Sequence, residues 1–561
     1  MASKSESTAP ARVQLSHGAE RALSDLRSRR EHVKRKAMQD LRGAVEMEAR
    51  QMSRENFSSF ITELNRRIFD LVKSEEPHEK LGGIFAMDAL VDVECEESPT
   101  FITRFANYLR LILPCNNVAT MIMASKVLGH LAQAGGTLTA DFVEFEMKRA
   151  LEGLNSEKRS EHHRLAAVLV CKELAVNAPT LFFMHVPAYI KAIWTGIHDS
   201  KQLIREAAIE SLRASLHIIA QRDMSVRNKW FFIVFEEAQR GLRFEAVEVI
   251  HGSLLVIGEL LLLQQVMESQ MPEGFKLEKI NMTVMRYCDH RDALVRKTVI
   301  GLLPVIASID CDTFRANFAA DALAYLISSL KKGNERAVTF LSLSALLHIA
   351  GPQLVEAHRQ DLFVLVLDGI TPTPRKPLVL EAATCIASLA ALDPTNVQVQ
   401  EAMPELIEQM LAACEGNLTP SLIAALSEIA RSMPLLHPDI QMKLLDSISF
   451  TLQRTPYQPS GTPNYRRIAP LVRGGTPSAS AGPNAKGREA AVIQALFALA
   501  EFDFSGNQLC EFVEDCVSLF LDDSSPQVRL TAAKTCSRLL LRPGDAGYCQ
   551  LSPLLYVNPH L

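Results

Sequence analysis

Residues 204–216 read IREAAIESLRASL, and residues 250–261 read IHGSLLVIGELL. Each is a mainly apolar stretch of helical length that carries a small residue, Ala208 or Gly252. Segments of the same kind occupy residues 82–91, 121–132, 162–175 and 295–307. When they are aligned on Ala86, Ala124, Ala167, Ala208, Gly252 and Val299, successive segments lie 38, 43, 41, 44 and 47 residues apart. The chain therefore contains an internal repeat.

A period of about 40–47 residues is typical of HEAT and armadillo arrays, whose unit contains a pair of antiparallel helices. One pair cannot bury its apolar face alone, so neighbouring pairs stack, and small residues lie where two helices approach closely. Similar segments at residues 340–350 and 380–390 continue the pattern. The sequence thus predicts an all-α fold, a HEAT/armadillo-type α-solenoid of antiparallel helix pairs.

Composition agrees with an extended helical array. The 561 residues are 48% hydrophobic but only 6% aromatic, and a single core stops growing near about 250–300 residues. The formal net charge of −5 gives no electrostatic footprint for nucleic acid. The 11 cysteines show no C-x-x-C spacing, which predicts buried, reduced thiols in a cytosolic or nuclear compartment.

Three units carry the turn pattern of HEAT repeats, an Asp followed at a short distance by an aliphatic residue and an Arg. We expect the Asp to cap the following helix by accepting a backbone N–H bond. The Arg falls in the first turn of the second helix, where it is expected to reach an Asp of a neighbouring repeat. The predicted structural turn residues are Asp199, Arg205, Asp289, Arg296, Asp522 and Arg529.

The chain divides into five predicted segments. Residues 1–19 are polar and predicted to be disordered, and HEAT repeats are predicted over residues 20–454 and again over residues 489–544. Between them, residues 455–488 contain six prolines and five glycines, which predicts a disordered loop inside the array. Residues 545–561 form a divergent tail.

Two stretches allow more than one interpretation. The most apolar run, Val249–Met267, is interrupted by His251 and Glu259. A membrane span needs about 20 apolar residues without charges, so we interpret this run as a buried solenoid helix. The basic run of residues 34–36 could be a nuclear-import signal, but short basic runs are common on helices, and a solvated helix face is the simpler interpretation.

The sequence contains no recognisable catalytic, cofactor-binding or metal site. It lacks G-x-x-x-x-G-K-[ST], G-x-G-x-x-G, H-R-D and D-F-G motifs. His162 and His163 are adjacent, so on a helix they point about 100° apart and cannot chelate one metal together. Several cysteines lie in or beside apolar helix stretches, where core packing is the default role. We therefore predict that this chain has no enzymatic activity and binds no cofactor or metal.

The predicted loop carries three Thr-Pro pairs, at Thr455, Thr462 and Thr476. Proline-directed kinases need an accessible Thr-Pro in an extended segment, so these residues are candidate phosphosites. A phosphate would add about −1.5 to −2 charges beside the arginines of the loop. The alternative is an inert spacer, because long loops cost little entropy.

Several strings resemble the target of rapamycin (TOR) kinases, which belong to the phosphatidylinositol-3-kinase-related class. They occur in the family's order at residues 82–84, 104–114, 123–154, 235–241, 250–260 and 534–540. The string FVEFEMKRALE, residues 142–152, is not a generic feature of HEAT arrays. The resemblance runs from about residue 20 to residue 544 and covers only the family's N-terminal HEAT region.

This resemblance implies an N-terminal scaffold that docks a Raptor-type subunit and contributes to dimerisation of the TOR complex in nutrient and growth signalling. It implies a cytoplasmic protein, with peripheral association to endomembranes and nucleus through the complex, and no transmembrane segment. The family's kinase domain, with its ATP and Mg²⁺, lies far C-terminal of the matching region. The divergent tail leads us to expect a truncated gene product, splice form or fragment.

One competing function shares the repeats but not the TOR strings. An importin- or phosphatase-scaffold-like HEAT adaptor would have the same fold and would bind different partners. Importin-like proteins tend to be strongly acidic, and a net charge of −5 over 561 residues is mild. The TOR-type scaffold is therefore the leading hypothesis.

Overall fold

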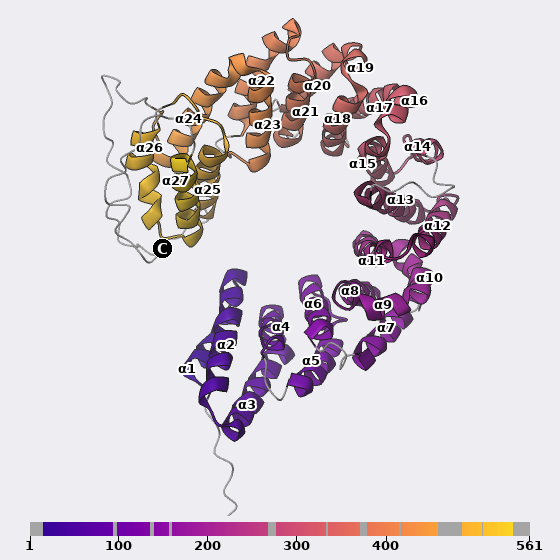
Figure 1. Ribbon diagram of the computed structural model, residues 1–561, viewed down its shortest axis with the longest axis vertical. Helices are drawn as coiled ribbons and strands as arrows, with labels where there is room; N and C mark the ends of the chain where they lie inside the picture. Colours follow the sequence, from indigo (N-terminus) through magenta and orange to yellow (C-terminus); the bar gives the residue numbers. More distant parts are fainter. Residues whose placement is uncertain are drawn as a thin grey trace, which may run out of the picture. The chain divides into compact units, whose positions relative to one another are not determined.

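The computed structural model describes residues 15–93, 98–134, 140–155, 160–267, 277–332, 335–370, 378–414, 417–457, 485–507 and 509–541. Every regular element within these ranges is a helix, which confirms the all-α prediction for the described part of the chain. Contacts divide the chain into two compact units, Met1–Lys276 and Leu277–Leu561. Each unit is a stack of helix pairs (Figure 1).

In the first unit, helices alternate between two rows. Each helix of the first row, which we call row B, contacts the next one along the row. Row B consists of α2 (Glu31–Gln51), α4 (Pro77–Val91), α6 (Val118–Ala134), α8 (Glu161–Asn177), α11 (Gln202–Ala220) and α13 (Val247–Met267). Row A consists of α1 (His17–Asp25), α3 (Arg54–Lys73), α5 (Ser98–Ile112), α7 (Ala140–Asn155), α9 (Pro179–Met184), α10 (Val186–Ile197) and α12 (Met224–Gly241).

The second unit repeats this arrangement. Its row B consists of α15 (Ala293–Ile309), α18 (Arg336–Ala350), α21 (Val379–Leu392), α23 (Pro420–Ser432), α25 (Ala485–Glu501) and α27 (Pro526–Leu541). Row A consists of α14 (Leu277–Met285), α16 (Cys311–Asn317), α17 (Ala319–Lys332), α19 (Pro352–Glu356), α20 (Arg359–Ile370), α22 (Val397–Ala413), η2 (Pro434–Leu436), α24 (His437–Gln453), α26 (Cys510–Asp515) and η3 (Val517–Asp522). Several row A helices are therefore split into two short pieces.

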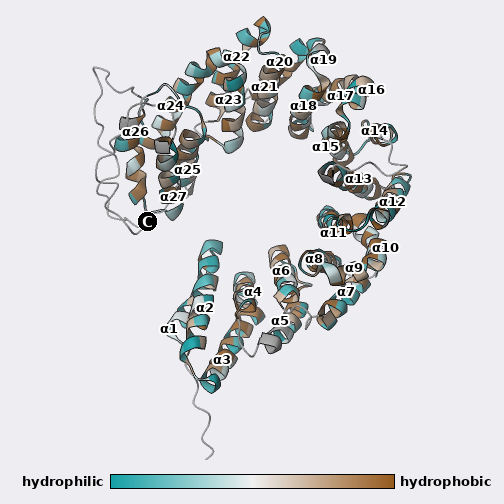
Figure 2. Cartoon of the chain, viewed as in Figure 1, coloured by the Kyte–Doolittle hydropathy of each residue, from teal (hydrophilic) through white to brown (hydrophobic). Residues whose placement is uncertain are grey.

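The position of a helix in the stack explains its sequence pattern. Helix α8 is packed between α6 and α11, and every residue from Leu165 to Cys171 is buried. Helix α3 buries one stripe, which includes Phe60 and Leu64, and leaves charged residues in water, as a single-sided amphipathic helix does. In Figure 2 the hydrophilic colour runs along most of α2, which is the first helix of row B.

Small residues allow the helices to approach closely, as the repeat predicted. The aligned residues of the six segments are all buried, on helices α4, α6, α8, α11, α13 and α15. A Cβ on Gly252 would lie 2.1 Å from the carbonyl oxygen of Ile197, and one on Gly82 would lie 2.1 Å from that of Leu26. Because a backbone carbonyl cannot rotate away, these glycines set the spacing between neighbouring helices.

The described structure extends beyond the predicted boundaries at three places, and at two of them it is helical. Helix α1 begins at His17, within the segment predicted to be disordered over residues 1–19, because Leu15 and Ala19 pack in the core. At the start of the loop predicted over residues 455–488, Tyr457 is buried and its ring centroid lies 5.5 Å from that of Phe512. At its end, α25 already begins at Ala485. Residues 1–14, 458–484 and the tail 545–561 lie outside the described residues.

Helix α13 contains the run that could be confused with a membrane span. The window Val247–Gln265 is long and apolar enough to cross a membrane by length and composition, and it is the one such helix among the described residues. However, 72% of that window is buried inside the protein. The interpretation of this run as a buried solenoid helix is therefore confirmed.

Candidate functional site

The three predicted arginines make the same contact at the start of three row B helices. Arg205 donates through Nη1 to the carbonyl oxygens of Asp199 at 2.7 Å and Ser200 at 3.1 Å. The same pair of bonds joins Arg296 to His290 and Arg291, at 2.6 and 2.9 Å, and Arg529 to Asp523 and Ser524, at 2.7 and 3.2 Å. Each arginine thus fastens the helix to the turn that precedes it, and we call this contact the arginine clamp.

The side chain that closes the turn lies six residues before each arginine. Asp199 Oδ1 accepts from the backbone N–H of Lys201 at 2.9 Å. The residue in the same place is His290 in the second turn, whose Nδ1 accepts from Asp292 N–H at 3.1 Å, and Asp523 in the third, whose Oδ1 accepts from Ser525 N–H at 2.8 Å.

This register corrects two of the predicted turn residues. Asp289 and Asp522 each precede the residue that closes the turn, His290 and Asp523, by one position. The Asp289 side chain is 88% exposed and lies 3.8 Å from Lys332. In all three turns the closing side chain lies at the same distance along the chain before the arginine. A histidine imidazole can therefore occupy the position at which the prediction placed a carboxylate.

The clamp arginines also reach the next repeat, but not the predicted Asp. Arg205 Nε donates to His251 Nδ1 on α13 at 3.0 Å. Arg296 Nη2 pairs with Glu335 at 2.6 Å, just before α18. An Asp does join two repeats on the other side of the turn. Asp199 accepts a hydrogen bond from Arg164 of the preceding repeat at 2.6 Å. Neighbouring repeats are thus joined by charged hydrogen bonds whose acceptor varies.

These bonds are structural because they are shielded from water. Arg205 is 4% exposed and Asp199 is 6% exposed. Hydrogen bonds to charged groups contribute about 1.5–3 kcal/mol, and leaving one partner buried and unpaired costs at least as much. More exposed ion pairs also link successive row B helices, including Arg213 to Glu259 and Lys172 to Glu210, at 2.6 Å each.

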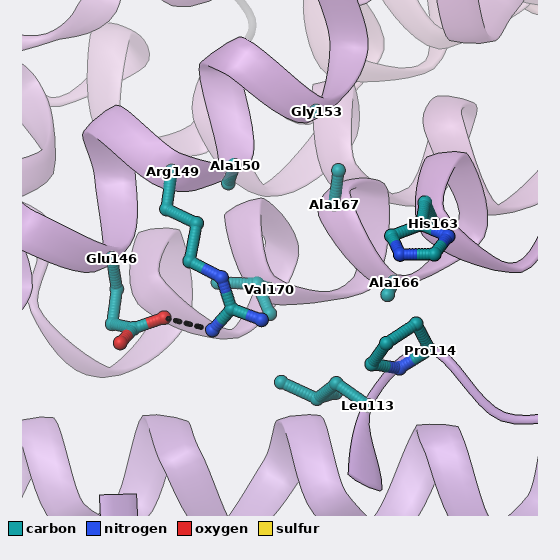
Figure 3. A pocket seen from close by; sticks show the side chains of 10 residues that line it. All are labelled: Leu113, Pro114, Glu146, Arg149, Ala150, Gly153, His163, Ala166, Ala167 and Val170. Atoms are coloured by element: carbon teal, nitrogen blue, oxygen red, sulfur yellow. Dashed lines mark hydrogen bonds and ion pairs between the residues drawn. The ribbon is translucent and has the colours of Figure 1, made fainter. Parts of the chain in front are cut away.

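One small pocket lies between two repeats of the first unit (Figure 3). It is lined by Leu113 and Pro114 after α5, by Glu146, Arg149, Ala150 and Gly153 on α7, and by His163, Ala166, Ala167 and Val170 on α8. Its cavity volume is about 40 Å³, whereas pockets for small molecules measure about 300–1,000 Å³. This pocket is therefore much smaller than the sites that hold small molecules.

The charged residues of this pocket are already engaged with each other. Glu146 is 1% exposed and is paired with Arg110 on α5, and Arg149 Nη1 lies 3.5 Å from it (Figure 3). Arg149 Nη2 also donates to the carbonyl oxygen of Arg110 at 3.0 Å. The side chain of His163 is hydrogen-bonded to Ser160 at 2.8 Å. Sequence reasoning missed this cluster, although the string FVEFEMKR contains most of it.

The buried cysteines are poor nucleophiles. Burial raises the pKa of the Cys171 and Cys385 thiols to about 12, and that of Cys414 to about 11. A nucleophilic cysteine needs a lowered pKa, because the thiolate is the reactive form. These thiols therefore pack in the core, in line with the role expected from their apolar surroundings.

The other sequence candidates have simple positions. Within the described ranges, no group of three or more His, Cys, Asp or Glu side chains is arranged to hold a metal ion. Thr455 is half-buried just after α24, whereas Thr462 and Thr476 lie outside the described residues. The basic run is not a uniformly solvated face, because Lys34 is 2% exposed and burial lowers the pKa of its ammonium group.

Comparison with known proteins identifies homologues of this chain. No family model matches the sequence. The serine/threonine-protein kinase TOR of Arabidopsis thaliana is 36% identical over 522 residues, which cover 93% of this chain and 20% of that protein. Tor1 of Schizosaccharomyces pombe is 33% identical over 93% of this chain and 22% of its own length. This chain is a homologue of the TOR kinases. It matches a HEAT region in the N-terminal part of TOR.

The match to TOR covers most of this chain but a small part of its relatives. TOR of Oryza sativa is 37% identical over 87% of this chain and 19% of its own length. The chain thus spans about a fifth of the length of the curated TOR proteins that it matches.

Solved structures agree on the fold. Kap121p bound to Nup53p superposes with a TM-score of 0.53 at 12% identity, over 93% of this chain and 56% of that chain. Kap121p bound to Pho4p gives a TM-score of 0.53 at 13% identity, over 93% and 57%. At this level of identity the likeness concerns the fold alone, and it confirms the predicted HEAT/armadillo-type α-solenoid.

Proposed function

We propose that this chain is the N-terminal HEAT scaffold of a TOR-type serine/threonine kinase. In this proposal it mediates assembly of the TOR complex by docking a Raptor-type subunit and by contributing to dimerisation, in nutrient and growth signalling. The observation that carries the proposal is homology to TOR kinases over 93% of the chain. Phosphoryl transfer, with ATP and Mg²⁺, belongs in this proposal to the kinase domain of the complete protein.

The geometry supports a scaffold because the ionisable side chains hold neighbouring repeats together. Arginines, histidines and carboxylates join one repeat to the next, as Arg205 does with His251 and Arg296 with Glu335. The buried thiols have raised pKa values, and the pocket on α7 and α8 is small. Stacked repeats instead offer an extended surface, which is how solenoids bind other proteins. We place this scaffold in the cytoplasm, with peripheral association to endomembranes and nucleus through the complex.

The proposal is tested by co-purifying the 561-residue chain with a Raptor-type subunit. Kap121p provides a control with the same fold and unrelated sequence. We expect the Raptor-type subunit to be retained on this chain and not on Kap121p. Equal retention on both solenoids, or no retention on either, would overturn the assignment and favour a general adaptor of the importin or phosphatase-scaffold type.

The assignment of catalysis to another domain is tested separately. The purified chain is incubated with radiolabelled ATP, Mg²⁺ and a protein substrate, after contaminating kinases have been removed. We expect no phosphate transfer above the rate without protein, because the sequence lacks the motifs that hold ATP and its metal ions. Transfer that follows the protein through purification would contradict this assignment.

A further inference from the structure

A histidine of the first unit is held between two carboxylates of the preceding repeat. His130 lies on α6, and its Nδ1 is 2.8 Å from Oδ1 of Asp88 on α4. Its Nε2 is 2.8 Å from Oδ1 of Asp92, the residue that directly follows α4. The two aspartates are four residues apart, so they lie on one face of the helix and hold the ring at both nitrogens. The imidazole therefore joins the second helix pair of this unit to the third.

This geometry needs the protonated form of the ring. A neutral imidazole has one N–H and one acceptor nitrogen, whereas the imidazolium donates from both nitrogens. An ionised carboxylate only accepts. A neutral His130 would therefore donate to one aspartate and turn a lone pair toward the other at 2.8 Å. Both contacts are favourable together only while the ring carries its proton.

The other charges around α6 have partners of their own. On α2, Arg42 donates to Oδ2 of Asp92 at 2.7 Å and to Glu46 at 2.9 Å. On α8, Glu173 lies in the fields of Lys172 and of Lys126, which is on α6 itself. On the row A side, α5 and α7 contact α6, and their ion pairs join Arg110 to Glu146 and Lys148 to Glu144. The groups that bond the imidazole are thus the two aspartates.

The same contacts keep His130 protonated at a higher pH than an exposed histidine. The hydrogen bond to Asp88 raises the pKa of His130 above its ordinary value of 6.5, burial lowers it, and the hydrogen bond to Asp92 raises it again, so that the net shift is upward. With a raised pKa in the folded state, the stabilisation is complete below about pH 6.5 and is lost as the pH rises through the folded pKa. The response therefore falls above about pH 6.5, where histidine can follow physiological pH.

Loss of the proton leaves the two carboxylates with too little positive charge. While the ring is protonated, two cations, Arg42 and His130, face Asp88 and Asp92. Afterwards Asp92 keeps its bond to Arg42, whereas Asp88 has no further hydrogen-bond partner in the part of the chain that the structure describes. Like charges four residues apart on a helix repel each other and destabilise it.

The opposite side of α6 is held by close packing of small groups. A Cβ on Gly129, the residue before His130, would lie 2.5 Å from Nδ2 of Asn177 and 2.9 Å from Cβ of Glu173, both on α8. This close approach does not need the proton of His130. A change at His130 therefore acts on the contact between α4 and α6 and leaves that between α6 and α8 in place.

We propose that His130 is a pH-sensitive joint between two repeats of the array. In its protonated form it ties α6 to both aspartates of the preceding repeat. When it loses the proton it releases one of them, and the contact between α4 and α6 opens more often. The joint thus makes the stiffness of this part of the solenoid fall as the pH rises, whichever partner the scaffold binds.

A titration of the complete chain tests the first requirement. Nuclear magnetic resonance with isotope-labelled histidine follows each imidazole, and the signal that disappears in His130→Gln belongs to His130. We expect its pKa to lie above 6.5 in wild type and to fall in Asp88→Asn, which removes one of the two charges. A pKa at or below 6.5 in wild type, or no decrease in Asp88→Asn, would overturn the proposal.

Hydrogen exchange of α4 and α6 measures the opening itself. At each pH the exchange rate of His130→Gln is divided by that of wild type, so the effect of pH on the exchange chemistry cancels. We expect a ratio of at least about three near pH 6, and a ratio of about one or less near pH 9. The matched control is His32→Gln at an exposed position of α2, whose ratio is expected to stay near one at both pH values. Equal ratios for His130→Gln at the two pH values would indicate a merely structural role and refute the joint.

Asp88→Asn is expected to keep the joint and remove its response to pH. The introduced amide can donate as well as accept, so a neutral ring between it and Asp92 satisfies both contacts. In this background the effect of His130→Gln should change less than about twofold between the two pH values. The full wild-type pH dependence in this background would assign the response to another group and contradict the proposal.

Far-UV circular dichroism shows whether each variant is folded. If His130→Gln does not fold, wild type and Asp88→Asn are compared with each other. Their exchange rates in α4 and α6 are then expected to converge or diverge with pH, and a ratio that does not change with pH would equally refute the joint.

Discussion

The arginine clamp is a small motif with a measurable share in stability. Arg205→Ala and Arg296→Ala remove bonds to two turn carbonyls and to the next repeat. We expect each substitution to lower the free energy of unfolding by about 1–3 kcal/mol, because charged hydrogen bonds are lost from shielded positions. Urea unfolding measures the change. Midpoints unchanged in both variants would mean that the clamp behaves as an ordinary surface ion pair, worth about 0–1 kcal/mol.

The register of the turn gives a second prediction with an internal control. His290 accepts a hydrogen bond from Asp292 N–H, whereas Asp289 is exposed. His290→Ala is therefore expected to destabilise by about 1 kcal/mol, and Asp289→Ala by less than about 0.5 kcal/mol. Chemical denaturation of the two variants shows which of the two side chains closes the turn. A larger effect of Asp289→Ala would restore the register inferred from the sequence.

A half-buried imidazole makes the stability of the first unit depend on pH. Burial lowers the pKa of His198 from 6.5 to about 4, and the charge of Arg240 adds to this effect. The unfolded chain takes up this proton near pH 6.5 and the folded chain only near pH 4, so stability falls as the pH falls through this window. Between pH 7 and pH 5 the loss is about 2 kcal/mol.

The prediction for His198 is measured as a difference between variants. His198→Gln is expected to lose less stability than wild type between pH 7 and pH 5, whereas His32→Gln, at an exposed position, is expected to follow wild type. Urea unfolding at each pH gives the slopes. Parallel slopes for wild type and His198→Gln would show that this imidazole is not the responsible group.

At the residue scale, sequence reasoning located the arginines but not their partners. An Arg in the first turn of a helix is visible as a pattern, because its distance to the preceding turn is fixed along the chain. Its partner in the next repeat is set by packing across about 40 residues, and it is His251 in one case and Glu335 in another. No local pattern distinguishes these acceptors, and none marked the ion pairs around Glu146.

Single helices show which glycines matter. A Cβ on Gly252 in α13 would lie 2.1 Å from a backbone carbonyl oxygen, whereas one on Gly301 in α15 would meet nothing within 4 Å. Gly252→Ala is expected to destabilise by about 1–3 kcal/mol, since α13 must move away from Ile197. Gly301→Ala is expected to stabilise by about 0.5–1 kcal/mol, because alanine is the better helix former. Thermal or urea unfolding shows whether each variant is stabilised or destabilised. A change in the same direction in both variants would contradict the argument.

At the element scale, the repeat predicted which helices are central to the stack. The aligned segments became row B helices, which pack against their neighbours along the row. The sequence could not distinguish Gly252 from Gly301, since both occur in apolar helices and only the neighbouring backbone separates them. Two helices also begin a few residues before the predicted start of their segment, at His17 and Ala485, where the flanking residues are polar or glycine-rich.

The two tryptophans provide a probe of the two units. Trp194 on α10 and Trp230 on α12 are the only tryptophans of the chain, and both belong to the first unit. Phe340→Ala, in the core of the second unit, is expected to cost about 3–5 kcal/mol. It should shift the midpoint of far-UV circular dichroism and leave that of tryptophan fluorescence unchanged, because repeats interact with their neighbours only.

The matched variant for this experiment is Phe182→Ala, a fully buried residue of the first unit. It is expected to shift the fluorescence midpoint. If Phe340→Ala moves both signals together, the two units unfold as one cooperative body.

The arginine clamp has a consequence for how such arrays evolve. The hydrogen bonds of Nη1 stay within one repeat. The arginine N–H that faces the next repeat donates to a histidine in one case and to a glutamate in another. A repeat can therefore be duplicated, lost or exchanged and still close its own turn, while the new neighbour needs only to offer some acceptor. Arrays built in this way can keep their architecture as their sequences drift.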